Sequence, residues 1–461
     1  MRSIPKEVDL GKDPVGRLLF TLAAPAITSQ LVNALYNVVD RMYIGHIPEN
    51  GAAALTGLGV CFPLIMLISA FANLIGMGGA PRASILMGHG DEKAAERILG
   101  NCFAALVALS VILTALSFLF MRPMLMLFGA SGATIGYATD YMEIYAAGTI
   151  FVQLTLGMNV FITAQGFSKI SMMTVVIGAA INIILDPIFI FIFDMGVRGA
   201  AWATVISQAV SAVWAVRFLC GGRTVLKLRR ANMKISRAVL TPCVALGLAP
   251  FIMQSTESLL VLSFNSSLLK YGGDIAVGAM TIASSVMQFA MLPVQGLTQG
   301  SQPIVSYNYG AGNPERMKQA FAMLLKSCLA CTAALWALSM FCPGLFVRIF
   351  TDDPELTATA RWALRIYMAG MGVFGAQIAC QQTFIALGNS RTSSFLAMLR
   401  KIILLIPLIY ILPHFFDDKV FAVFFAEPVA DIIAVATTVT LFSREFRRLL
   451  RSMRAGSAPR A

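Results

Sequence analysis

Long apolar stretches recur along the whole chain and are separated by short polar stretches. A helix that crosses a bilayer needs about 20 apolar residues, because each residue advances the helix by about 1.5 Å. The pattern predicts twelve such helices, near residues 17–44, 53–80, 97–120, 137–165, 170–193, 199–219, 240–270, 276–305, 319–346, 361–387, 393–415 and 420–443. Almost no sequence remains for a soluble domain, so we predict an all-α membrane protein.

The charge of the chain supports this prediction. Only 13% of the residues are charged, whereas soluble domains carry roughly 25%. If the N-terminus is cytoplasmic, 27 of the 35 cations fall on the inner side, in Arg2–Arg17, Arg82–Arg97, Lys169, Arg217–Arg237, Arg316–Lys326, Arg391–Lys401 and Arg444–Arg460. This positive-inside pattern predicts that both termini are cytoplasmic. The net charge of +12 is therefore a signal of topology rather than of nucleic-acid binding.

Two clusters of residues repeat at an offset of 222 positions. The first copy is Pro81, Ser84, Gly88, Gly90, Ala164, Gly166, Ser168, Lys169 and Ser171; the second is Pro303, Ser306, Gly310, Gly312, Ala386, Gly388, Ser390, Arg391 and Ser393. Six spans in each half give both halves the same orientation, which predicts parallel lobes around a central cavity. We predict an N-lobe at 1–219, a basic cytoplasmic linker at 220–238, a C-lobe at 239–443 and a basic cytoplasmic tail at 444–461.

Carboxylates inside predicted spans are the candidate functional groups, because charge in a membrane is costly. In the N-lobe, Asp40 follows Asn33 and Asn37 at helical spacing. Two further pairs lie four residues apart and thus share a helix face: Asn182 with Asp186, and Thr204 with Gln208. Such a cluster can exchange protons or bind Na⁺, a hard cation that prefers oxygen ligands. The alternative is a structural role, in which hydrogen bonds only fix the packing of the helices.

The C-lobe has a different set of acids. Glu257 lies three residues after Gln254, and Glu427 and Asp431 are four apart across Pro428. Glu257 and Gln254 are the C-lobe candidates, and Glu427 and Asp431 are weaker ones, since these two acids can also brace the helix around the proline. The position that corresponds to Asp40 is the neutral Asn265. The lobes are thus chemically unequal, and we expect the coupling chemistry mainly in the first half.

Several segments resemble one transporter family. The stretch Asn33–Gly45, the stretches Asn182–Pro187 and Gly199–Thr204, and the paired Gly-x-Gly loops at Gly88 and Gly310 occur in the order found in multidrug and toxic compound extrusion (MATE) transporters. The resemblance covers nearly all twelve spans and is greatest to the bacterial DinF and MepA types. It implies a cation-coupled antiporter, driven by H⁺ or Na⁺, with two six-helix lobes and a V-shaped cavity.

The resemblance also implies roles for individual residues. Residues that match Asp40, Asn182, Asp186 and Thr204 form a cation-coupling site in the N-lobe of that family. Glu257 matches a glutamate used in the C-lobe of the NorM branch. That branch has a second acid in its tenth helix, whereas the segment 365–387 has none between its ends. A complete C-lobe site of the NorM type is therefore not expected.

We expect the exported compounds to be small, organic, cationic and amphipathic, because acidic pockets favour cationic cargo. Adaptable side chains suit varied ligands, so the candidate path residues are Met158, Phe161, Met287, Gln288, Phe289 and Met291. We expect a monomer in the plasma membrane that needs no cofactor except the coupling ion and binds no metal and no nucleic acid.

Other functions fit the sequence less well. A lipid-linked saccharide flippase of the same superfamily would tend to have fourteen spans and a cationic cavity, and a non-transporting sensor would leave dye levels in cells unchanged. The string Gly88-His89-Gly90-Asp91 is found in intramembrane proteases, but here it falls in a predicted loop. No phosphate-binding loop with a Gly-Lys-Ser/Thr ending is present. We therefore expect a transporter and not an enzyme.

Overall fold

The computed structural model describes residues 8–48 and 51–455, and these residues are almost entirely helical, with no strand among them. The α-helices are α1 Val15–Gly45, α2 Gly51–Gly88, α3 Glu92–Leu127, α4 Ile135–Ala147, α5 Thr149–Ala164, α6 Ser168–Pro187, α7 Gly196–Cys220, α8 Arg237–Ser255, α9 Glu257–Gly310, α10 Pro314–Phe341, α11 Pro343–Val347, α12 Pro354–Tyr367, α13 Met371–Ala386, α14 Ser390–Met398, α15 Ile406–Ile411 and α16 Lys419–Arg454. Short π- or 3₁₀-helical turns are η1 Ile188–Ile192, η2 Arg230–Asn232, η3 Leu399–Leu405 and η4 Leu412–His414.

Twelve spans can be counted among the described residues. Nine helical stretches are long and apolar enough to cross a membrane, and two bent pairs, α4 with α5 and α12 with α13, bring the count to 11. One of the nine, Arg237–Gly310, is 74 residues long and contains two spans that meet at Gly273. The backbone of Gly273 has φ 63° and ψ −161°, a conformation that glycine adopts readily. The twelve-helix fold predicted from the sequence is therefore confirmed.

Several helices extend beyond the apolar stretches that predicted them. The helix α16 continues to Arg454, so most of the described part of the predicted tail is helical. The spans formed by α4 with α5 and by α12 with α13 are bent by 58° and 47°. Hydropathy marks the part of a helix that crosses the lipid, but it carries no information on where the helix bends or ends.

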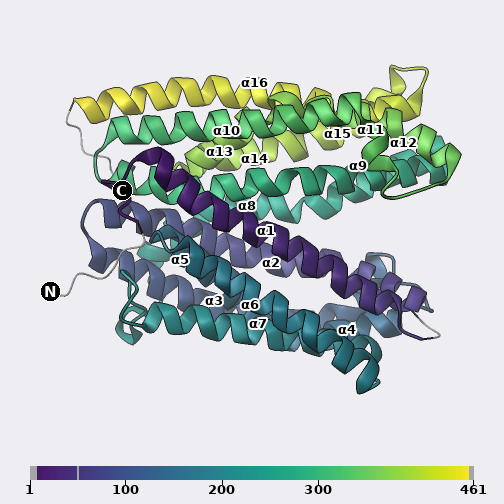
Figure 1. Cartoon of the computed structure of the whole chain (residues 1–461), viewed down its shortest axis with the longest axis horizontal. Coiled ribbons are helices and arrows are strands. Elements are labelled where there is room, and N and C mark those ends of the chain that lie inside the picture. The colour runs from purple at the N-terminus through teal and green to yellow at the C-terminus, as the bar shows by residue number, and fades with distance from the viewer. Residues whose placement is uncertain (1–7, 49–50, 456–461) are drawn as a thin grey trace.

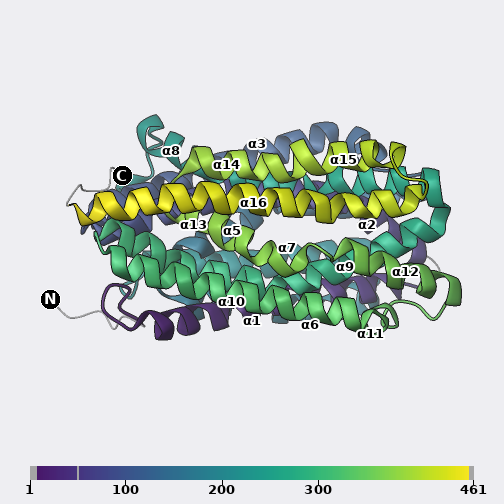
Figure 2. The same cartoon turned by 90° about the horizontal axis from the view of Figure 1, so that it is seen from above.

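The helices form two lobes that pack side by side (Figure 1). The helices α1–α7 make the N-lobe and α8–α16 make the C-lobe, and the start of α1 and the end of α16 lie at the same end of the molecule. We call this end, which carries the linker between α7 and α8 and the last turns of α16, the basic end. Figure 2 shows from above that α11 and α12 lie at the opposite end.

The lobes contact each other through glycines. A Cβ atom on Gly78 or Gly88 of α2 would overlap a backbone oxygen of α8 or α9, and one on Gly247 or Gly310 would overlap a backbone oxygen of α2. The repeat also recurs in turn geometry: Gly90 and Gly166 have φ of 82° and 91°, and their counterparts at +222, Gly312 and Gly388, have φ of 69° and 75°. The two halves thus reuse the same turns.

Toward the opposite end the lobes separate. The helices α1 and α9 touch where Ala23 meets Gly300 and where Ile27 meets Gly296. One to two turns further along the same faces, Leu31 is 51% exposed and Phe289 is 49% exposed. The ribbons of α1 and α9 accordingly diverge in Figure 1. The lobes are thus in close contact toward the basic end and diverge toward the opposite end.

Candidate functional site

Four of the predicted site residues come together inside the N-lobe. Asn182 donates hydrogen bonds from Nδ2 to Oδ1 of Asp186 at 3.3 Å and to Oγ1 of Thr204 at 3.5 Å. Asp40 of α1 interacts with Asp186 of α6. All four side chains are buried, and the carboxyl group of Asp186 is fully so. Three helices thus bring two acids, an amide and a hydroxyl to one point.

The local sequence explains this convergence. Asn182 and Asp186 lie one turn apart on α6, which packs along α1 and then gives way to η1 after Pro187. The small residues Gly199, Ala200 and Ala203 let α7 pack closely against α6 and η1. This packing places Thr204 beside Asn182. The two carboxyl groups can form a hydrogen bond with each other only when one of them holds a proton.

Several oxygen atoms of this cluster have no hydrogen-bond partner. Among the described residues, Oδ1 of Asp40, Oδ2 of Asp186 and Oδ1 of Asn182 are buried and unpartnered. Buried polar atoms are normally satisfied, because leaving one without a partner costs about 1–3 kcal/mol. Oxygen atoms are the ligands that hard cations prefer, and carboxylates accept protons. These unpartnered oxygen atoms could therefore bind a proton or a small hard cation.

Two tyrosines near the cluster were not anticipated from the sequence. Tyr36 lies one turn before Asp40 on α1 and interacts with Asp40 and Asp186. Tyr141 of α4 is buried and interacts with Asp40 and Thr204. The spacing of Tyr36 from Asp40 could have indicated the first. The second required knowledge of how α4 packs on α2 and α7.

The outer members of the predicted polar stripe do not join the cluster. Asn33 and Asn37 are exposed, and Asn37 donates its amide hydrogen to the backbone oxygen of Asn33 at 2.7 Å. Gln208 lies one turn beyond Thr204, and its buried Oε1 is unpartnered among the described residues. The stripe on α1 therefore runs from an exposed surface to the buried acid, whereas Gln208 extends the polar interior along α7.

The C-lobe contains two buried cations that the sequence analysis placed wrongly. The charge survey counted Arg400 and Lys401 among the cations of the inner side, although the predicted span 393–415 contains them; both belong to η3 inside the eleventh span. Arg400 forms ion pairs with Glu427 and Asp431, each at 2.7 Å, and its guanidinium lies 4.3 Å from the ring centre of Phe374. The error arose because the survey did not separate cations inside a span from those of loops, and here each cation neutralises acids of neighbouring spans.

Lys401 neutralises Glu257, the third candidate acid of the C-lobe. Its ammonium group forms an ion pair with Glu257 and donates a hydrogen bond to the backbone oxygen of Met253 at 2.6 Å. The side chain of Lys401 is only 9% exposed, whereas that of Glu257 is 60% exposed. Gln254, the other C-lobe candidate, accepts a hydrogen bond from Asn73 of α2 at 2.5 Å and so joins the two lobes.

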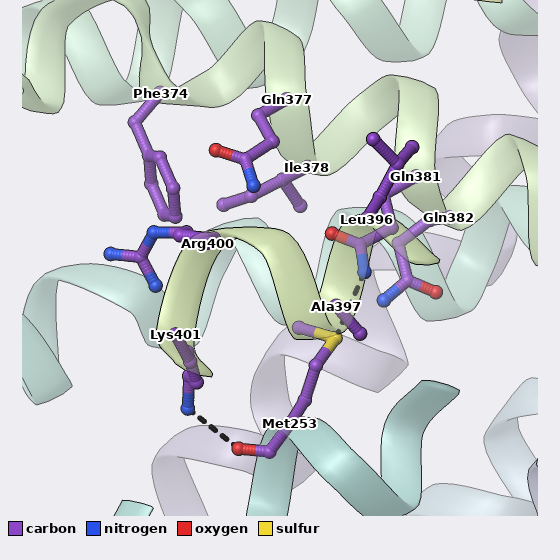
Figure 3. Close-up of a pocket in the computed structure, with 10 residues that line it drawn as sticks. All are labelled: Met253, Phe374, Gln377, Ile378, Gln381, Gln382, Leu396, Ala397, Arg400 and Lys401. Atoms are coloured by element: carbon purple, nitrogen blue, oxygen red, sulfur yellow. Dashed lines mark hydrogen bonds between the residues drawn. The ribbon is translucent and has the colours of Figure 1, made fainter. Parts of the chain in front are cut away.

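A small cavity of about 30 Å³ adjoins these cations (Figure 3). Gln377, Gln381 and Gln382 of α13 face it together with Arg400 and Lys401. Gln381 donates a hydrogen bond to the sulfur of Met253 at 3.3 Å. The C-lobe interior is thus polar, but its acids are paired with cations of the chain itself, unlike those of the N-lobe cluster.

The candidate path residues differ in their positions. Met158 and Phe161 are fully buried in the core between α2, α3 and α5, so they do not line an open path in this conformation. Met287 and Met291 are partly buried against the C-lobe core. Gln288 and Phe289 are exposed on α9, on the part of the helix that has separated from α1. Helix periodicity alone did not distinguish the fully buried path residues from the exposed ones.

Two lobes of six spans, related by a repeat and diverging toward one end, define a multi-pass membrane transporter. The profile of the MatE family matches the chain twice, at residues 25–188 and 250–411. The chain therefore belongs to the MatE family, as the resemblance predicted. The two matched segments correspond to the two lobes and thus support the internal repeat.

Individual relatives agree with this assignment. The multidrug export protein MepA of Staphylococcus haemolyticus is 25% identical over 93% of this chain and 94% of its own length. MepA of Staphylococcus aureus strain NCTC 8325 is also 25% identical, over 94% of this chain and 95% of its own. The MATE multidrug transporter DinF-BH, solved with a bound compound, is 34% identical to this chain. The match covers 96% of this chain and 99% of the DinF-BH chain, with a TM-score of 0.88. An outward-facing MATE transporter is 22% identical over 95% of this chain and 97% of its own, with a TM-score of 0.89, and so shares the fold.

Proposed function

We propose that this protein exports small cationic, amphipathic organic compounds in exchange for H⁺ or Na⁺ that enters through Asp40 and Asp186. The observation that carries the proposal is the pair of buried acids with unpartnered oxygens in the N-lobe. The names of the MepA proteins and of the multidrug transporter DinF-BH support an organic cargo. Within residues 8–48 and 51–455, no cation forms an ion pair with these two acids, in contrast to the acids of the C-lobe.

The geometry suggests a simple cycle. In the conformation open at the end opposite the termini, a proton or Na⁺ reaches Asp40 and neutralises the acidic pair. Neutralisation removes the electrostatic attraction for a cationic substrate and relieves the cost of buried, unpaired oxygens. The ion-loaded N-lobe then favours closure at the open end. Opening at the basic end releases the ion there and restores the acids for the next substrate.

The proposed direction of transport depends on the orientation. Once Arg400 and Lys401 are removed from the 27 cations of the survey, 25 of the 35 cations in the sequence remain in the segments assigned to the cytoplasmic side. The positive-inside rule then puts both termini in the cytoplasm and the open end outside the cell. Export driven by the ion gradient follows, since the ion enters from the outside while the substrate leaves.

Dye efflux tests the role of Asp40. Cells that overexpress the wild-type chain should accumulate less ethidium than control cells, and Asp40→Asn should abolish this difference. Asp140→Asn is the matched control, because Asp140 is an N-lobe acid with a half-exposed side chain that pairs with Arg198 at 3.7 Å. Full efflux by Asp40→Asn, at equal expression, would overturn the proposal. Unchanged dye levels with the wild-type chain would instead favour a flippase or a sensor.

Proteoliposomes distinguish the two coupling ions. Vesicles with an imposed pH gradient and no Na⁺ should support ethidium transport if protons are the coupling ion. If Na⁺ is the coupling ion, transport should appear only with a Na⁺ gradient at equal pH on both sides. Transport that needs neither gradient would contradict ion coupling altogether.

A further inference from the structure

A second cavity lies at the end of the C-lobe opposite the termini. It has a volume of about 500 Å³ and is lined by the last residues of α10, by α11 and by one face of α12. Three of its lining residues are Arg348, Arg361 and Arg365. A cavity of this size suits a lipid headgroup or a small ligand. None of the coupling residues lies in it.

The arginines of this cavity lie outside the segments that hold most of the chain's cations. Eight cations fall outside the basic segments of the charge survey, and three of the eight line this one cavity. Neither Arg348 nor Arg361 forms an ion pair with an acid within residues 8–48 and 51–455. The nearby acid Asp353 caps α12, accepting a hydrogen bond from the backbone N–H of Leu356 at 2.8 Å. The cavity therefore has unneutralised positive charge.

The helices hold the guanidinium groups in place. Arg361 and Arg365 lie one turn apart on α12 and so share a face. Arg365 donates a hydrogen bond from Nε to the backbone oxygen of Met340 at 2.9 Å. Arg361 lies over Gly344, where an added Cβ would come within 3.2 Å of its Nη2 atom. The absence of a side chain at Gly344 thus leaves room for the guanidinium beside α11.

The rim of the cavity is apolar. Phe341 and Leu345, which line it, are 76% and 62% exposed, and Ile349 beside them is 73% exposed. Exposed apolar side chains at the end of a membrane span lie against acyl chains, while arginines at that level contact headgroups. Guanidinium groups bind phosphate with two parallel hydrogen bonds. The chemistry therefore suits a phosphate group that is joined to acyl chains.

We propose that this cavity binds the phosphate headgroup of an anionic phospholipid, in the leaflet at the end opposite the termini. Arg348 and Arg361 hold the phosphate, Arg365 fixes the wall of the cavity, and Phe341 and Leu345 contact the acyl chains. A soluble anion would gain nothing from the apolar rim, which is why the lipid is favoured. The proposal is independent of the proposed export function, because the cavity is remote from Asp40.

Native mass spectrometry of the full chain in detergent tests the proposal with phosphatidylglycerol as the probe. The wild-type chain should bind the first phosphatidylglycerol molecule about tenfold more tightly than Arg348→Gln/Arg361→Gln, since each charge-assisted hydrogen bond contributes strongly. Arg122→Gln/Lys270→Gln is the matched control, because it removes two exposed cations at the same end that do not line the cavity. Equal binding by wild type and by the Arg348/Arg361 variant would overturn the proposal.

Two further comparisons separate the possible ligands. Phosphatidylcholine, which has no net charge, should show no difference between the wild type and the arginine variants. Inorganic phosphate should bind far more weakly than the lipid; if it binds equally well at this site, the ligand is a soluble anion and the lipid proposal is wrong. Arg348→Lys/Arg361→Lys keeps the charge and should retain part of the affinity, which excludes misfolding as the cause of the loss.

Discussion

Lys401 forms an ion pair with Glu257, which lies 144 residues earlier in the chain. The pair joins the eleventh span to the seventh inside the C-lobe. It means that the glutamate expected to bind a coupling ion already has a cation of the protein beside it. A similar arrangement surrounds Arg400, which holds Glu427 and Asp431. The C-lobe thus pairs its three candidate acids with its own cations, whereas Asp40 and Asp186 form no such pair in the described part of the chain.

The first prediction concerns Glu257. Removing its charge leaves the ammonium group of Lys401 largely buried, with only the backbone oxygen of Met253 as a partner. We expect Glu257→Gln to destabilise the protein by about 1–3 kcal/mol, measured as thermal unfolding in detergent, and to reduce dye efflux only in part. The double variant Glu257→Gln/Lys401→Met should recover most of the stability. A double variant that is less stable than the single one would show that the pair is not the source of the effect.

A larger loss is expected at Arg400. Without its guanidinium group, two carboxylates that are almost completely buried lack a cation, and breaking such a pair costs about 3–5 kcal/mol. We expect Arg400→Gln to lower the unfolding temperature sharply. The neutral triple variant Arg400→Gln/Glu427→Gln/Asp431→Asn should regain stability. If the stable triple variant still exports dye, the network is structural; if it folds but does not transport, these acids have a role in the cycle.

Thr204 distinguishes the two coupling ions by a different route. Its hydroxyl group accepts a hydrogen bond from Asn182 and is an available oxygen ligand for Na⁺. Thr204→Val keeps the shape and removes the oxygen, so Na⁺-driven transport should need about fivefold more Na⁺ for half-maximal rate, corresponding to about 1 kcal/mol. Proton-driven transport should change much less. Thr114→Val is the control, since Thr114 bonds to the backbone oxygen of Ala146 away from the cluster.

The contact between the lobes gives a fourth prediction. Gly78 lies against the backbone of Cys243, which cannot move aside, whereas Gly59 on the same helix has open space around its Cα. Gly78→Val should therefore hold the lobes apart at the basic end and cost about 1–3 kcal/mol, while Gly59→Val should have little effect. Distances between spin labels on the two lobes at the basic end measure the change. Identical distance distributions for the two variants would rule out a close contact at Gly78.

The sequence was sufficient for the fold, whereas only the family resemblance joined Asp40 and Thr204 to the pair Asn182 and Asp186. Hydropathy reports which segments cross the lipid, and the four-residue spacing of Asn182 and Asp186 fixes a shared face. The interior of the C-lobe could not be predicted in this way. Arg400 and Lys401 lie nine and ten residues after Arg391, and only the packing of α14 and η3 against α8 and α16 shows that they are buried. Three acids in the spans of one lobe were a signal that cations had to be nearby.

The repeated glycine turns have a consequence for the history of the chain. Gly90 and Gly312, like Gly166 and Gly388, keep the same left-handed backbone although the side chains around them differ. This is the trace expected of gene duplication, in which a six-span ancestor paired with an identical copy. After fusion the two halves could differ: in this chain the C-lobe has Arg400 and Lys401 beside its candidate acids, whereas Asp40 and Asp186 have no ion-pair partner among the described residues. A present-day half, expressed alone, should therefore be unable to replace its partner.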